Sequence, residues 1–87
     1  MASIQELIGT VSQIKVSSDE LSVLVGAAAA SISQSAGKIA MISQGSKSGQ
    51  EATSQVNMAA SKLSEVASAL RVLSSDCGGM MQEISSL

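Results

Sequence analysis

At the middle of the sequence stands Ser43-Gln44-Gly45-Ser46-Lys47-Ser48-Gly49, the one stretch that is dense in both glycine and serine. Such residues mark turns, because glycine tolerates unusual backbone angles and serine can bond to the nearby backbone. No proline occurs in the 87 residues. Since proline is the residue that most strongly interrupts a helix, the sequence allows one long helix on each side of this turn.

The segment before the turn repeats uncharged, mostly apolar residues every seven positions in two rows. Such paired rows are typical of a helix that packs along a second helix. The rows are Ile4, Val11, Ser18, Val25, Ile32, Ile39 and Leu7, Ile14, Leu21, Ala28, Ser35, Ile42. Serine is tolerable in such a row because its hydroxyl can bond to a carbonyl of its own helix.

The segment after the turn carries the same repeat. Its rows are Gly49, Val56, Leu63, Leu70, Cys77, Ile84 and Ala52, Ala59, Val66, Leu73, Met80, Leu87. A short turn makes the two helices antiparallel neighbours. We therefore predict one seam between them. Its main residues would be Leu7, Val11, Ile14, Leu21, Val25, Ile32 and Ile39 on one side, and Val56, Leu63, Val66, Leu70 and Leu73 on the other.

Local signals place the ends of the helices. A serine followed three residues later by glutamate is a capping box, which starts a helix. Ser3 with Glu6 and Ser48 with Glu51 both fit it. We expect a single domain, residues 1–87, with helices over 3–44 and 48–86 and a turn over 43–49. A third start signal, residues 17–20, leaves a break near Ser17 as an alternative, but the rows pass through it in phase.

The predicted fold is all-α, an antiparallel two-helix hairpin. A lone hairpin buries little apolar surface, so we expect it to complete a four-helix bundle by dimerisation or with another helical protein. Apolar residues outside the predicted seam would form the partner-binding face, although single exposed apolar residues are also common on protein surfaces. The face comprises Ile8, Val16, Val23, Leu24, Met58, Val72 and Met81.

The amino-acid composition argues against catalysis and against metal or cofactor binding. The chain has no histidine, the commonest general base and metal ligand. Its serines have no activating neighbour, and Gly45-Ser46-Lys47-Ser48-Gly49 has no preceding strand to make it a phosphate loop. The single cysteine, Cys77, is expected to be a buried apolar residue. We predict no enzyme activity, no catalytic residues, no cofactor and no metal site.

Charge limits the partners. The net charge is −2 and the five basic residues are scattered, so neither nucleic acid nor an anionic membrane surface is expected to bind. The most apolar run, residues 21–32, is too short to span a bilayer, which takes about 20 apolar residues. The amino terminus lacks the basic start of a secretory signal peptide. The expected partner is therefore a helical protein.

The layout resembles the Trp-X-Gly family of small type VII secretion substrates, the early-secreted-antigen type. Those are leaderless helical hairpins with a Trp-X-Gly turn at mid-chain. Here Ser43, Gln44 and Gly45 occupy that turn, so the glycine matches and Ser43 replaces the tryptophan. The family's Tyr-x-x-x-Asp/Glu export signal has no tyrosine here, only the spacing of Val72 and Asp76.

The resemblance implies a secreted substrate, or a signal-less partner or chaperone that targets a larger effector such as a Leu-X-Gly toxin. We expect the protein in the cytoplasm of the producing bacterium and then outside it, without a cleaved signal peptide. Two alternatives stay open. One is a polymerising subunit of a secretion needle or filament. The other is a chemoreceptor-like signalling hairpin, which the Gln50-Glu51 and Gln82-Glu83 pairs weakly favour.

Overall fold

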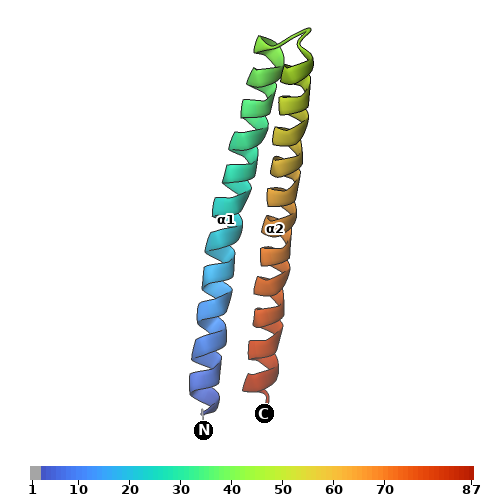
Figure 1. The fold of residues 1–87 in the computed structure, drawn as a ribbon. Helices are drawn as coiled ribbons and strands as arrows, with labels where there is room; N and C mark the ends of the chain where they lie inside the picture. Colours follow the sequence, from blue (N-terminus) through green and yellow to red (C-terminus); the bar gives the residue numbers. More distant parts are fainter. Residues whose placement is uncertain (1–2) are drawn as a thin grey trace.

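Two antiparallel helices of 39 residues each make up the fold, α1 over Ile4–Ile42 and α2 over Lys47–Ser85. The computed structural model describes residues 3–87; Met1 and Ala2, with which the predicted domain begins, lie outside this range. The hairpin measures 63 × 19 × 13 Å, and the start of α1 and the end of α2 lie together at the end opposite the turn (Figure 1). The predicted all-α hairpin is confirmed.

The helix ends follow one predicted cap and depart from the other. Ser3 caps α1, and its Oγ accepts a hydrogen bond from the Glu6 N–H at 3.1 Å, as expected. The predicted cap at Ser48 is wrong, because Ser46 caps α2 and accepts from the Gly49 N–H at 3.1 Å. The connection is therefore shorter than the predicted residues 43–49, with α1 ending at Ile42 and α2 beginning at Lys47.

The first helix is continuous through the serine-rich segment where a break was the alternative. Ser18 Oγ donates to the Ile14 carbonyl at 2.7 Å, and Ser22 Oγ donates to the Asp19 carbonyl at 2.8 Å. These hydroxyls bond within their own helix, so they can be buried without leaving an unpaired polar group. Both serines are buried against α2.

Small side chains dominate the seam between the helices. Ala29, Ala36 and Gly49 are buried, and so are Ala60 and Ala67. Among residues 3–87, only three larger residues are buried: Val11, Cys77 and Ile84. They form a cluster near the open end of the hairpin, with Ile8 and Met81 packed against it. Small residues let two helix backbones approach toward the lower end of the usual 8–10 Å range of interaxial distances.

The seam uses one of the two predicted rows on each helix. The rows through Val11 and through Leu63 lie in it, with Val25, Ile32, Ile39, Val56, Leu63 and Leu70 half-buried. The predicted companion rows do not: Leu7, Ile14, Leu21, Val66 and Leu73 are all exposed. Their places are taken by the rows one residue further on, through Ser22, Ala29 and Ala36 and through Ala60, Ala67 and Ser74.

The physical reason for this shift is side-chain size. Leucine and isoleucine at the centre of the seam would hold the backbones apart, whereas alanine and serine allow them close contact. With the small residues inside, the large residues are displaced to one side of the seam. They remain partly covered by the neighbouring helix but are not enclosed by it.

Candidate protein-binding surface

One side of the hairpin carries a continuous row of large aliphatic residues from both helices. Leu7, Ile14 and Leu21 recur every seven residues on α1, so they project from one side of that helix. Val66, Leu73 and Met80 do the same on α2. Ile14 and Leu21 share the lining of one groove of about 370 Å³ with Leu70 and Leu73, which places the two rows on the same side.

We call these six residues the aliphatic face: Leu7, Ile14, Leu21, Val66, Leu73 and Met80. None of them is charged. Each remains 41–48% exposed in the isolated hairpin. Six large apolar side chains in one patch are more than the scattered single residues that protein surfaces commonly expose. The patch occupies the half of the hairpin that is nearer the chain ends.

The opposite side of the hairpin is polar and shallow. A groove of about 410 Å³ is lined there by Gly26, Ala29, Ala30, Ser33, Asn57, Ala60, Ser61 and Ser64. Small residues and hydroxyls of this kind gain little from leaving water. This groove is therefore chemically different from the aliphatic face, although Val16 and Val23 of α1 are exposed as well.

The edges of the aliphatic face differ in charge. On α1 the edge is formed by Thr10, Ser17 and Leu24, which are uncharged; Thr10 and Ser17 line the same groove as Ile14. On α2 the corresponding positions, which precede and follow Leu73 at helical spacing, include Asp76 and Glu83. One edge thus presents hydroxyl groups and the other presents carboxylates.

The structure brings only some of the predicted partner-binding residues together: Val23 and Leu24 line one shallow pocket with Glu20. Ile8 and Met81 are half-buried and pack against the buried Val11, Cys77 and Ile84. Their role in partner binding stays a prediction. Leu24 borders the aliphatic face, one heptad beyond Ser17. Val16 and Val23 belong to the row that continues to Ala30, which lines the polar groove.

The remaining two predicted partner-binding residues, Met58 and Val72, are exposed on another row of α2, fourteen residues apart. The sequence pattern does not reveal the aliphatic face, because the sevenfold repeat assigns its members to the seam. Side-chain size could have identified it. Where two neighbouring rows are both uncharged, the row with the smaller residues is more suited to face the other helix at close range.

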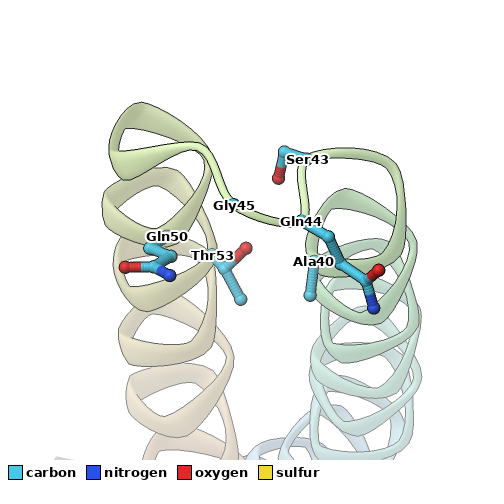
Figure 2. A pocket seen from close by; sticks show the side chains of 6 residues that line it. All are labelled: Ala40, Ser43, Gln44, Gly45, Gln50 and Thr53. Atoms are coloured by element: carbon cyan, nitrogen blue, oxygen red, sulfur yellow. The ribbon is translucent and has the colours of Figure 1, made fainter.

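The predicted turn motif forms the tip of the hairpin. Gly45 has a φ of +81°, the left-handed conformation that glycine adopts most readily. With Ser43 and Gln44 it lines a niche of about 330 Å³ that also includes Ala40, Gln50 and Thr53. Figure 2 shows Ala40 and Ser43 on the α1 side of this niche and Gln50 and Thr53 on the α2 side.

Ser43 occupies the place of the tryptophan in the Trp-X-Gly pattern, and it lies against Gly49. Its Oγ donates to the Ile39 carbonyl, and a Cβ at Gly49 would overlap the Ser43 side chain. The helices are therefore in close contact directly below the turn. An indole at position 43 would not fit in this orientation, because a single methyl group across from it already lacks room.

In the described part of the chain, one hydrogen bond between side chains crosses the seam. Lys15 Nζ donates to Ser74 Oγ at 3.1 Å and to Asp19 Oδ2 at 3.2 Å. The Ser74 hydroxyl and the Lys15 ammonium lower the pKa of Asp19. The lysine stem passes close to Gly78, since its Cε lies 3.6 Å from the place that a Cβ would take there, while its charge stays paired and partly solvated.

Within residues 3–87, no group of three or more histidine, cysteine or carboxylate side chains is placed to hold a metal ion. Cys77 is buried as a free thiol, as predicted. Neither helix, over its described length, is long and apolar enough to cross a membrane. No family model, curated protein or solved structure matched the chain.

Proposed function

We propose that this chain is a non-enzymatic, protein-binding hairpin of a bacterial type VII secretion system. It would act as a secreted substrate or as the targeting partner, or chaperone, of a larger secreted effector. The observation that supports protein binding is the aliphatic face, in which six large and partly exposed aliphatic side chains from both helices lie on one side of the hairpin. Burying such side chains contributes roughly 1.5–3 kcal/mol each when complete.

The assignment to type VII secretion depends on the resemblance to the Trp-X-Gly hairpins in architecture and in the turn glycine. Gly45 lies at the tip in a left-handed conformation, which is a reason for a glycine at this place. The partner expected from this resemblance is helical, either a second small hairpin or the amino-terminal helical domain of a larger effector. A hairpin's aliphatic face is suited to pack against such helices.

The experiment is affinity capture of the tagged chain from its producing bacterium, with mass spectrometry of the bound proteins. The paired variant is Ile14→Gln with Leu73→Gln, which removes apolar area from the aliphatic face. The matched control is Ser33→Gln with Ser64→Gln, which places the same side chains on the polar groove. We expect a helical partner with the unchanged chain and with the control, and its loss with the paired variant.

Two results would contradict the proposal. One is a captured protein that binds the paired variant as well as it binds the unchanged chain, because the partner would then use another surface. The other is an unchanged amount of this chain, or of its captured effector, in the culture medium of a strain that lacks the type VII membrane channel. Recovery of long fibres instead would favour the filament alternative.

A further inference from the structure

Two consecutive glycines, Gly78 and Gly79, interrupt α2 close to the end of the helix. We infer that they form a hinge, and that residues 80–85 beyond them open as a unit that uncovers Cys77 while the rest of the hairpin stays folded. We call residues 80–85 the end segment. The hinge goes beyond the proposed function, because its opening concerns the isolated hairpin and needs no partner.

The two glycines weaken the helix without serving the seam. Glycine in a helix interior is less favourable than any residue except proline, because it loses the most backbone freedom on folding. Close packing does not require either glycine. Within residues 3–87, an added Cβ at Gly79 meets no atom within 4 Å, and one at Gly78 meets only the Lys15 Cε, at 3.6 Å. That distance is an ordinary contact with a flexible side chain, so alanine would fit at both positions.

The chemistry of the helix end adds to this weakness. The last turn of α2 holds no basic residue, which would interact favourably with the negative end of the helix dipole. It holds the carboxylate of Glu83 instead, which is unfavourable there. The start of α1, at the same end of the hairpin, is stabilised by the Ser3 cap and by Glu6 in its first turn. Of the two helix ends that meet here, the end of α2 is therefore the one that opens.

Side-chain packing across the hinge holds the end segment closed. Met81 and Ile84 belong to the segment, and they pack in one cluster with Val11 of α1 and with Cys77, which precedes the hinge. In the closed hairpin Cys77 is 7% exposed and Ile84 is 8% exposed. When the segment moves away, Met81 and Ile84 leave the cluster, and the Cys77 thiol becomes accessible to solvent.

The hinge bears on the aliphatic face, because Met80 is the first residue of the end segment. While the segment is closed, Met80 continues the row of Val66 and Leu73 on α2. When the segment opens, this row ends at Leu73. A partner that covers Met80 would bind the closed form and shift the opening equilibrium toward it. This consequence rests on the proposed function, whereas the hinge itself does not.

Cys77 is the single cysteine of the chain and a free thiol, so it serves as a native reporter of opening. The test follows its alkylation by iodoacetamide in the full chain, by mass spectrometry, at constant pH and in increasing urea below the unfolding transition. A buried thiol reacts only from open states, so the rate measures their population. We expect the rate to depend weakly on urea, because local opening exposes little surface and global unfolding exposes much.

Three variants make the test specific. Gly79→Ala should slow labelling about fivefold, the factor that corresponds to the difference in helix propensity between glycine and alanine. Gly37→Ala is the matched control, since its methyl group also meets no atom within 4 Å among residues 3–87, but it lies on α1 outside the cluster. It should leave the labelling rate unchanged. Ile84→Ala removes packing that holds the segment and should speed labelling at least about tenfold.

Circular dichroism checks that each variant is folded, and Met81→Ala, which truncates a half-buried side chain, replaces Ile84→Ala if that variant is not. Equal slowing by Gly79→Ala and Gly37→Ala, with a urea dependence as steep as that of global unfolding, would overturn the inference. Cys77 would then be exposed only when the whole hairpin unfolds. Labelling that none of the variants changes would overturn it as well, because Cys77 would then react without any movement of the segment.

Failure of the hinge can be told apart from failure of the proposed function. Labelling is measured on the isolated chain, and capture of a helical partner is measured with the aliphatic-face variants. A hinge that fails leaves that capture as it was, and a chain that captures no partner still shows the labelling pattern expected of the hinge.

Discussion

At the scale of single residues, Gly49 shows how closely the two helices approach. A methyl group there would overlap the Ser43 side chain, and the Ser43 carbonyl oxygen lies only 3.1 Å from the added Cβ. By contrast, an added Cβ at Gly37 meets no other atom within 4 Å. The two glycines therefore separate the effect of packing from the effect of helix propensity.

We expect Gly49→Ala to destabilise the hairpin. Overpacking costs about 1–3 kcal/mol, which exceeds the gain in helix propensity of at most about 1 kcal/mol. Gly37→Ala should stabilise by about 0.5–1 kcal/mol, because only the propensity term acts there. Urea denaturation followed by circular dichroism measures both. A stabilised Gly49→Ala variant would show that the helices separate below the turn more easily than the packing indicates.

The lowered pKa of Asp19 predicts that the stability of the folded hairpin depends on pH. Its pKa is lowered by the Ser74 hydroxyl and by Lys15, so its folded-state pKa lies below the unfolded-state value of about 3.9. A carboxylate of this kind stabilises the folded state at pH values above its unfolded pKa. The contribution is lost as the pH falls through the folded pKa.

Asp19→Asn should accordingly lower the melting temperature at pH 7 by a small amount, and the difference from the unchanged chain should shrink at pH 2–3. Glu20→Gln is the matched control, because Glu20 makes no ion pair within residues 3–87. Thermal melts at the two pH values measure the difference in melting temperature between each variant and the unchanged chain. A deficit of Asp19→Asn that is equally large in acid would mean that the carboxylate charge is not what stabilises this contact.

At the scale of the helices, the start of α2 tests which serine is the cap. Ser46 accepts a hydrogen bond from the Gly49 N–H, whereas Ser48 is the second residue of α2 and its side chain is exposed. Ser46→Ala should cost about 1 kcal/mol, the usual value of a lost helix cap. Ser48→Ala should change stability by less than about 0.5 kcal/mol. Denaturation of both variants compares them, and a larger loss at Ser48 would support the capping box expected from the sequence.

At the scale of the whole molecule, the row of small residues in the seam has a direct test. Ala67 is 1% exposed, whereas Ala69 on the same helix is exposed. Ala67→Leu should cost about 1–3 kcal/mol, because the helices would have to move apart. Ala69→Leu should be nearly neutral. If Ala67→Leu were tolerated while Val66→Asp unfolded the chain, the seam would follow the predicted companion rows instead.

The sequence by itself determined much of this fold. Four features could be predicted: a turn that begins at Ser43, the two long helices, the cap at Ser3, and the seam rows through Val11 and Leu63. These features depend on local backbone preferences and on a sevenfold period, which are properties of a single chain segment. The capping residue of α2 is harder to predict, because Ser46 and Ser48 are both acceptable caps. The packing of the hairpin tip determines which of them is used.

Only the tertiary structure decided which companion row faces the other helix. On each helix, two rows lie next to the row that prediction and structure have in common, and either could face the other helix. The prediction selected the row with the larger aliphatic residues. The row actually used even contains Lys15, which the contacts with Ser74 and Asp19 make acceptable. Side-chain size acts only when two backbones approach each other. The close contact of small residues therefore fixed the seam, and it left Leu7, Ile14, Leu21, Val66, Leu73 and Met80 on the surface as the aliphatic face.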